Sequence, residues 1–310
     1  MPVHNDLCDL IGNTPIFPLP RLSAALGEGV ELLAKAEHLN PGGSIKDRVA
    51  LGMIRAAEGD GRLQPGMTVT EATAGNTGLG LAWICAARGY RFVAVMSASD
   101  KGPKTEVMES MGAECVLVEP GPAWDSEEGC LGIAERIATE RGGVFLNQFE
   151  NAANPEAHAC TTAAEILAQT GGRIDAVVIG VGTGGTATGL ARVLKPAVPG
   201  LRLIGVAAEG SYLGSELEGD RIAGITPDFA PKIFDQDLLD EIVTITAADA
   251  TPATLRLARQ EGIPAGLSSG ALLLAAEAEA KRLLEQRPGR AARVLFTICD
   301  GVRNYPSLLA

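Results

Sequence analysis

Short apolar runs alternate with amphipathic segments and turn residues along most of this chain. Such alternation is typical of parallel β-strands joined by crossover helices. The pattern predicts strands at residues 67–70, 91–96, 114–118, 175–179, 201–207 and 293–298. It predicts helices at residues 78–88, 104–111, 126–141, 187–194, 248–260 and 270–285. We therefore expect an α/β fold with parallel or mixed sheets flanked by helices.

The length of 310 residues allows one or two α/β lobes, and two lobes with a cleft between them are the expected arrangement. Apolar residues make up 46% and charged residues 21% of the chain, which excludes a disordered or fibrous class. The sequence has no internal repeat and no long linker, so a boundary between lobes is expected near the Gly142-Gly143 break and the polar stretch of residues 148–155.

The formal net charge of −12 argues against a nucleic acid or an anionic membrane as partner, because both need a concentrated positive surface. The six cysteines form no CxxC pair, so no metal site is predicted. The three histidines, His4, His38 and His158, lack a triad or ligand pattern, and structural or surface roles are expected for them. The polar N-terminus and the lack of an apolar run of about 18 residues predict a cytoplasmic protein.

Two loops place polar side chains directly before a helical segment. Residues 40–48 read NPGGSIKDR, and Lys46 at this junction is near backbone donors that can lower its pKa and favour Schiff-base chemistry. The alternative is a solvated surface lysine. Residues 71–78 read EATAGNTG, where Thr73, Asn76 and Thr77 suit a carboxylate, although simple N-capping uses the same geometry.

Two further loops are rich in glycine or serine. Residues 180–186 read GVGTGGT, which contains GxGxxG, and Glu209 ends the next predicted strand. A dinucleotide site is therefore an alternative to a site for a single phosphate. Residues 265–271 read AGLSSGA, where a serine either caps the following helix or offers a hydroxyl to a ring nitrogen.

In this order, the segments resemble the cysteine synthase (O-acetylserine sulfhydrylase) and cystathionine β-synthase family of fold-type II pyridoxal-phosphate enzymes. The resemblance runs from LIGNTP at 10–15, through QF at 148–149 and ANPE at 153–156, to AGLSSGA. It implies a tryptophan synthase β-like fold with a smaller mobile domain of residues 1–12 and 36–148. Residues 13–35 and 149–310 are then the larger domain, which binds the cofactor phosphate.

The resemblance also implies a role for each motif residue. Lys46 is the lysine that carries pyridoxal phosphate, Asn76 contacts the ring hydroxyl and Ser268 faces the pyridine nitrogen. The phosphate is bound by Gly182, Thr183, Gly184, Gly185 and Thr186. The substrate carboxylate is bound by the loop residues Thr73, Ala74, Gly75 and Thr77 together with Gln148.

The implied reaction is β-replacement on an activated serine, with O-acetylserine and sulfide giving cysteine and acetate through an aminoacrylate intermediate. The family further implies a homodimer and the tail of a serine acetyltransferase as a partner. A catalytically inactive relative that binds a partner protein in its cleft is one alternative. An NAD-dependent oxidoreductase is another, but it leaves Lys46 and Ser268 without roles.

Three positions depart from the cysteine synthase pattern. Ala74 stands where the family has a serine, which removes one hydroxyl from the carboxylate site. Asp228, in GITPDFAP, is similar to the cystathionine β-synthase branch and indicates an acceptor with an amine, such as homocysteine, unless it only terminates a loop after Pro227. Residues 97–104 lack the family's serine-lysine pattern, and nothing in the sequence explains what this difference does.

Overall fold

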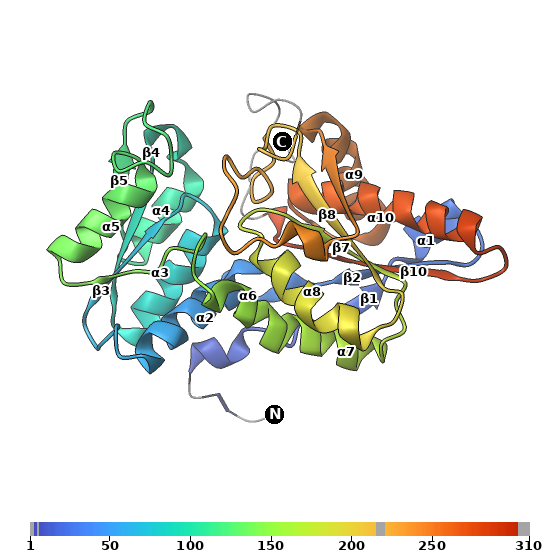
Figure 1. Cartoon of the computed structure of the whole chain (residues 1–310), viewed down its shortest axis with the longest axis horizontal. Helices are drawn as coiled ribbons and strands as arrows, with labels where there is room; N and C mark the ends of the chain where they lie inside the picture. The colour runs from blue at the N-terminus through green and yellow to red at the C-terminus, as the bar shows by residue number, and fades with distance from the viewer. Residues whose placement is uncertain (1–2, 5, 215–220, 303–310) are drawn as a thin grey trace.

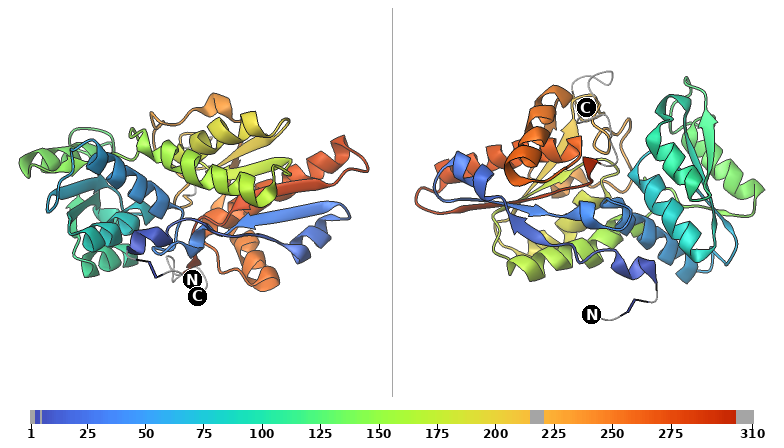
Figure 2. Two further views of the ribbon diagram at one scale, coloured as in Figure 1. Left: turned by 90° about the horizontal axis from the view of Figure 1, so that it is seen from below. Right: turned by 180° about the vertical axis from the view of Figure 1, so that it is seen from behind.

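The computed structural model describes residues 3–4, 6–214 and 221–302 of the chain. Two lobes lie side by side, each built on one β-sheet with helices against it (Figure 1). The views from below and from behind show the same two lobes (Figure 2). The α/β fold class with parallel or mixed sheets is thus confirmed, whereas the exact domain boundaries given above stay a prediction.

The first lobe contains a four-stranded sheet in the order β5-β4-β3-β6, and all its strands run parallel. These strands are β3 (Thr68–Ala72), β4 (Arg91–Ser97), β5 (Glu114–Val118) and β6 (Val144–Phe145). The helices beside it are α2 (Lys46–Gly59), α3 (Asn76–Arg88), α4 (Pro103–Ser110) and α5 (Cys130–Glu140). Helices on both faces of a parallel sheet bury its central strands, and β3 is buried at every position.

The second lobe contains a six-stranded sheet in the order β1-β2-β10-β7-β8-β9. Only β1 runs antiparallel to its neighbour, so this sheet is mixed. Its strands are β1 (Ile16–Pro18), β2 (Val30–Lys35), β7 (Ala176–Gly180), β8 (Arg202–Ala208), β9 (Glu241–Ile245) and β10 (Ala292–Thr297).

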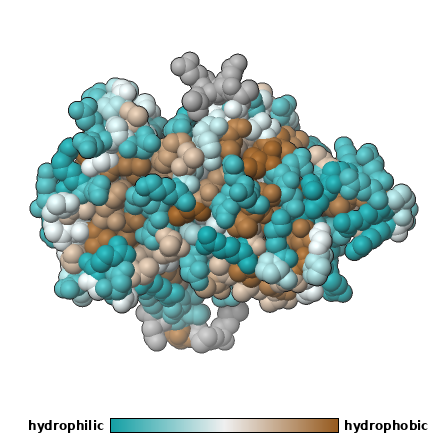
Figure 3. Space-filling view, viewed as in Figure 1, coloured by the Kyte–Doolittle hydropathy of each residue, from teal (hydrophilic) through white to brown (hydrophobic). Residues whose placement is uncertain are grey.

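The helices of the second lobe flank this sheet and include one π-helix. They are α1 (Pro20–Leu26), α6 (Ala153–Ala157), the π-helix η4 (His158–Ala163), α7 (Ala164–Thr170), α8 (Gly185–Ala197), α9 (Ala247–Glu261) and α10 (Leu267–Gln286). Short 3-10 helices complete the described chain: η1 (Leu7–Leu10), η2 (Glu37–Leu39), η3 (Ala98–Asp100) and η5 (Gln236–Leu238). No helix in the described part of the chain is long and apolar enough to span a membrane. Hydrophilic residues cover the right-hand end of the face shown in Figure 3.

Several elements differ from their predicted bounds for local reasons. The helix predicted from residue 126 begins at Cys130, because Ser126 and Gly129 donate backbone hydrogen bonds that close two turns before it. The helices between residues 153 and 170 were not predicted. Pro155 lies in the first turn of α6, where proline is tolerated.

A buried cluster of charged residues joins the start of α2 to β2 and α7. Arg48 Nε lies 2.7 Å from Glu37 Oε2, and Arg48 Nη1 lies 2.6 Å from Glu165 Oε1. Lys35 Nζ lies 2.7 Å from Glu165 Oε2 and also donates to the carbonyl oxygen of Thr14 at 2.8 Å. Charges in an interior are tolerated when each one is paired and hydrogen-bonded. The cluster therefore fixes the first turn of α2 against the larger sheet.

Replacement of Glu165 by glutamine tests this connection. Burial raises the pKa of Glu165, but hydrogen bonds from Arg48 and Lys35 outweigh burial and lower the pKa to about 2 from 4.5. We expect Glu165→Gln to lower the free energy of unfolding at pH 7 by about 3 kcal/mol, because two buried cations lose their shared carboxylate. A depressed carboxylate pKa contributes stability above pH 4.5 that is lost as the pH falls toward 2, so the difference should shrink at pH 3.

Urea unfolding of both proteins at pH 7 and pH 3 measures this effect. The control is Glu114→Gln, which removes an exposed ion pair with Arg141 and should cost less than about 1 kcal/mol. Equal losses in the two variants, or a loss in Glu165→Gln that does not depend on pH, would contradict the prediction.

Candidate active site

Four of the predicted site residues, Lys46, Asn76, Thr186 and Ser268, line one pocket. Each lies in the first turn of a helix, namely α2, α3, α8 and α10. The carboxyl ends of β7 and β10 form the floor, and the segment of residues 223–225 forms one wall. The pocket thus lies at the carboxyl edge of parallel strands, where open α/β sheets usually bind ligands.

Lys46 extends into this pocket from the first residue of α2. Burial lowers the pKa of its ammonium group, and the nearby Cys299 and Asp300 oppose this effect only in part. Within the described residues, Lys46 Nζ makes no hydrogen bond or ion pair. Lys46 therefore lies partly buried in a pocket, in an environment that favours the neutral amine.

Ser268 is buried and does not cap the helix on which it lies. The N-cap of α10 is Gly266, which has no side-chain cap, and Ser269 Oγ accepts the N–H of Cys299 at 3.2 Å. Among the described residues, the Ser268 hydroxyl makes no hydrogen bond, although it is only 4% exposed. A buried hydroxyl that lacks a protein partner and lines a pocket is available to a ligand.

The glycine-rich loop before α8 packs its backbone closely against neighbouring residues. Gly184 is the N-cap of α8 and has a φ of 79°, in the left-handed region that favours glycine. A Cβ on Gly182 would lie 2.2 Å from the carbonyl oxygen of Gly224, and one on Gly185 would lie 2.0 Å from Asn154 Oδ1. Only glycines fit at these places. The 13-residue helix α8 has no side-chain cap, and backbone N–H groups at such a helix N-terminus can bind an anion.

The loop of residues 73–77 forms a second hydrogen-bonded group beside Asn76. Thr77 Oγ1 donates to Gln148 Oε1 at 2.6 Å, and Gln148 Nε2 donates to the carbonyl oxygen of Ala72 at 3.2 Å. Thr73 Oγ1 accepts the N–H of Gly75 at 3.1 Å, and no side chain caps α3. The structure thus brings Gln148 to the loop of Thr73, Ala74, Gly75 and Thr77, although these five residues are not among those lining the Lys46 pocket.

Asp228 is the predicted site residue that lies apart from the others. Its carboxylate is exposed and accepts two hydrogen bonds from Arg221, at 2.7 Å and 3.2 Å. It is not among the residues lining the Lys46 pocket, whose wall ends three positions earlier at Ile225. The next residue, Phe229, packs on Phe149 with ring centroids 5.0 Å apart, and Phe149 also packs on Trp124 of the first lobe at 5.7 Å. Asp228 therefore lies beside an aromatic contact between the lobes.

Four polar residues at the site were missed by the sequence analysis. Asp300 Oδ2 accepts a hydrogen bond from Asn76 at 2.6 Å, and Asn154 Nδ2 donates to Thr183 Oγ1 at 3.0 Å. His158, for which a structural or surface role was expected, is fully buried and contacts Thr186. Glu71 accepts the N–H groups of Ala72 and Gln148 beside the loop of residues 73–77, and burial raises its pKa to about 8. These contacts join segments that are distant in sequence, so the sequence alone did not indicate them. Asn154 alone had an indication, because it lies in the ANPE motif of residues 153–156.

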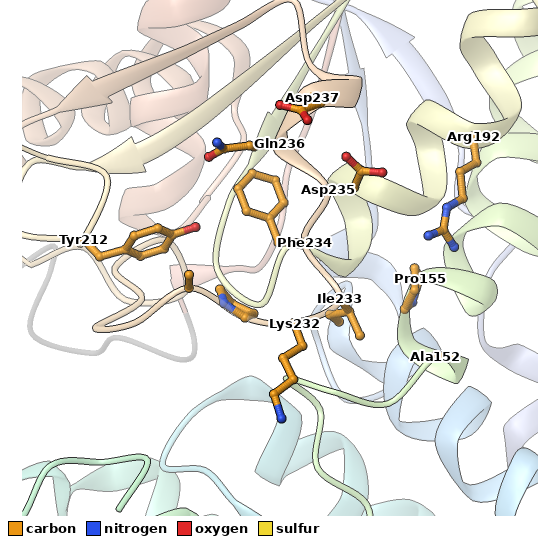
Figure 4. Close-up of a pocket in the computed structure, with 12 residues that line it drawn as sticks. Ala152, Pro155, Arg192, Tyr212, Lys232, Ile233, Phe234, Asp235, Gln236 and Asp237 are labelled. Atoms are coloured by element: carbon orange, nitrogen blue, oxygen red, sulfur yellow. The ribbon is translucent and has the colours of Figure 1, made fainter.

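A larger cavity of about 600 Å³ lies on the second lobe (Figure 4). Tyr212, Arg192 and Phe234 line it, together with other residues of the 230–237 segment. None of the predicted site residues lines this cavity. Phe234 lines this cavity and also contacts the glycine-rich loop before α8, since a Cβ on Gly184 would lie 2.3 Å from the Phe234 Cβ. The Lys46 pocket, with its buried polar groups, is the better candidate for an active site.

Comparison with known proteins gives a consistent result. The family described as "Pyridoxal-phosphate dependent enzyme" matches residues 7–300. Cystathionine beta-synthase from Rattus norvegicus is 40% identical over 310 residues, which cover 97% of this chain and 54% of the rat protein. The chain thus spans about half the length of this curated relative.

Two solved structures are similar along their whole length. The crystal structure of O-ureido-L-serine synthase matches with a TM-score of 0.90 and 37% identity, covering 99% of this chain and 94% of the other. O-acetylserine dependent cystathionine beta-synthase from Helicobacter pylori matches with a TM-score of 0.90 and 34% identity, covering 99% and 98%.

Proposed function

The chain belongs to the family of pyridoxal-phosphate-dependent enzymes, and from this premise we propose that it replaces the β-substituent of a small activated amino acid. The observation that carries the proposal is the pairing of Lys46 and Ser268 in one pocket, each without a hydrogen-bond partner among the described residues. Membership in this family replaces the dinucleotide interpretation of GxGxxG. An inactive, partner-binding relative is disfavoured by the reactive environment of Lys46.

The pocket residues fit the groups of pyridoxal phosphate. The loop of Gly182 to Thr186 is assigned to its phosphate, because it leads into the N-terminus of α8, which favours an anion. Lys46 is the amine to which we assign the cofactor aldehyde, and the Ser268 hydroxyl is assigned to the pyridine nitrogen. Asn76, fixed by Asp300, is assigned to the ring hydroxyl.

When bound, pyridoxal phosphate withdraws electrons from the Cα of an attached amino acid, which makes the Cα proton acidic and lets the β-substituent leave. Lys46 is placed to move that proton, since its lowered pKa favours the neutral amine, which can accept it. Ser268 offers a neutral hydroxyl instead of a carboxylate, so the chain holds no negative charge at that position to keep the ring nitrogen protonated.

The loop of residues 73–77 is the proposed site for the substrate carboxylate. Its hydroxyl and N–H donors lie at the N-terminus of α3, and Gln148 is attached to it through Thr77. Ala74 removes one hydroxyl from this set, so fewer donors face the carboxylate than in the family pattern. Movement of this loop toward the second lobe would exclude water from the site.

We propose O-acetylserine as the donor and sulfide as the acceptor, with cysteine and acetate as products. A thiol amino acid such as homocysteine is the second candidate acceptor. It is favoured by Asp228 and by the two cystathionine beta-synthases among the relatives, one of which is named as O-acetylserine dependent. A cytoplasmic location and a serine acetyltransferase tail as a partner in the cleft stay predictions.

The first test is the visible absorption of the purified protein with its cofactor. O-acetylserine should shift the absorption band of the wild type, and sulfide or homocysteine should restore it. Lys46→Ala should remove the band of covalently held cofactor and lower turnover by at least about 100-fold, because carrier and base are lost together. Lys281→Ala, which changes an exposed lysine on α10, is the control. Normal turnover by Lys46→Ala would contradict the assignment.

The second test separates the acceptors through Asp228. If its carboxylate binds the ammonium of a thiol amino acid, Asp228→Asn should raise the KM for homocysteine by about two- to fivefold, the range for a partly exposed ion pair. The KM for sulfide, which has no ammonium group, should not change. Asp237→Asn, at an exposed position nearby, is the control. Equal effects on both acceptors, or no use of homocysteine, would leave sulfide as the acceptor.

A homodimer is proposed from an apolar groove of about 300 Å³ on the first lobe, lined by Leu7, Leu79, Trp83, Val107 and other residues. Leu7 and Val107 are 50% and 49% exposed, which is unusual for large apolar side chains around one groove. A second copy of this chain would cover them. Val107→Glu should convert the dimer to a monomer in sedimentation experiments, whereas Leu117→Glu, at an exposed site outside the groove, should not. Monomeric wild-type protein would contradict the proposal.

A further inference from the structure

A buried chain of hydrogen bonds lies directly behind the proposed phosphate site. Thr162 Oγ1 lies 2.9 Å from His158 Nδ1, and Thr186 Oγ1 lies 3.1 Å from His158 Nε2. Thr162 and His158 are fully buried, and Thr186 is 6% exposed and lines the Lys46 pocket. The pocket is thus connected through one histidine to a threonine that has no contact with solvent.

The fold brings these three side chains together through close packing of two helices. A Cβ on Gly189 of α8 would lie 2.3 Å from the carbonyl oxygen of Pro155 and 2.9 Å from His158 Cβ. The absence of side chains at Gly185 and Gly189, one turn apart, lets α8 approach α6 and η4. The π-helix that begins at His158 then aligns Thr162 with the same ring. Single π-turns of this kind are frequent at functional sites.

The surroundings of His158 favour its neutral form. Burial lowers its pKa well below the usual value, and the nearby Lys46 and Arg48 lower it further, against a weaker opposite effect of Glu165. A neutral imidazole donates from one ring nitrogen and accepts at the other. The chain of hydrogen bonds therefore has two possible directions, and the direction decides what Thr186 offers to the pocket.

A phosphate group presents only acceptors, and a threonine hydroxyl has a single proton. If Thr186 donated that proton to His158 Nε2, its lone pairs would face the phosphate. If Nε2 carries the proton instead, Thr186 accepts from His158 and its own proton is available for the phosphate. Nδ1 must then accept a hydrogen bond, and the Thr162 hydroxyl is placed to donate it at 2.9 Å.

We propose that His158 and Thr162 are positioning residues that orient Thr186 as a hydrogen-bond donor to the cofactor phosphate. The proton order is Thr162 Oγ1–H to Nδ1, Nε2–H to Thr186 Oγ1, and Thr186 Oγ1–H to the phosphate. This inference rests on the proposed function, because it takes the loop of Gly182 to Thr186 as the phosphate site.

Nitrogen NMR of the cofactor-loaded protein with ¹⁵N-labelled histidine determines the proton position directly. The chain has three histidines, and His158→Gln identifies the signals that belong to His158. We expect a neutral ring protonated at Nε2 that persists from pH 6 to pH 8. Protonation at Nδ1, or a charged imidazolium within that range, would overturn the proposal. A purely structural histidine would have no reason to prefer the Nε2 form.

A set of threonine variants connects the proton order to cofactor binding. Thr162→Val removes the donor to Nδ1, and we expect it to weaken cofactor affinity by roughly two- to tenfold, the effect of one neutral hydrogen bond. It should also shift the phosphorus NMR signal of the bound cofactor. Thr162→Ser keeps the hydroxyl and should retain the wild-type values of both. A phosphorus signal unchanged in Thr162→Val would overturn the proposal even if that variant is less stable.

Thr186→Val separates failure of this inference from failure of the proposed function. It removes the hydroxyl that faces the phosphate and should weaken cofactor binding by roughly tenfold or more, as expected for a hydrogen bond to a charged group. If affinity does not change, the phosphate lies elsewhere and the proposed site is wrong. If Thr186→Val weakens binding but Thr162→Val has no effect, the site holds and the role of His158 and Thr162 is refuted.

Discussion

The position of α2 is the constraint on which the site depends, and it is determined by the ion cluster of Arg48, Glu37, Glu165 and Lys35. Lys46 lies two residues before Arg48, so the hydrogen bonds of the guanidinium to carboxylates from two other elements determine where α2 begins. This arrangement explains the early motif LIGNTP, since Thr14 donates to Glu37 and accepts from Lys35 through its carbonyl oxygen. The Lys46 amine has no hydrogen-bond partner among the described residues, and it is held in place because its neighbour Arg48 makes several hydrogen bonds.

The site is assembled from helix beginnings instead of from one continuous surface. Each of α2, α3, α8 and α10 contributes a residue of its first turn, and the carboxyl ends of β7 and β10 lie at the same pocket. Loops of this kind need small residues, because backbone atoms and ligand approach closely. The carbonyl oxygen of Gly224 and the side chain of Asn154 already occupy the space that side chains on the phosphate loop would need.

Sequence reasoning found the residues whose role depends on their own loop. Lys46, Asn76, Ser268 and the glycines before α8 stand at the start of a helix in segments rich in turn residues, and such segments are visible in the sequence as clusters of small and polar residues. It missed Asp300, Asn154, His158 and Glu71, because each acts through a contact with a distant segment. His158 shows the difficulty well, since nothing near it in sequence indicates that the absence of side chains on α8 brings Thr186 to its ring. Asp228 was located by its motif, but its pairing with Arg221 could not be predicted.

The meeting of several helix N-termini in one pocket has a consequence for which anions the protein admits. Its formal net charge of −12 gives the exterior a repulsive field for polyanions. That field is weakened by salt over about 8 Å, whereas the partial positive charges at the helix ends act at contact distance and are little screened inside the pocket. A small anion that fits between the lobes therefore gains the attraction and avoids most of the repulsion. Nucleic acids and acidic proteins are too large to enter the pocket. The protein therefore selects anions by size, because the repulsion acts over a longer range than the attraction.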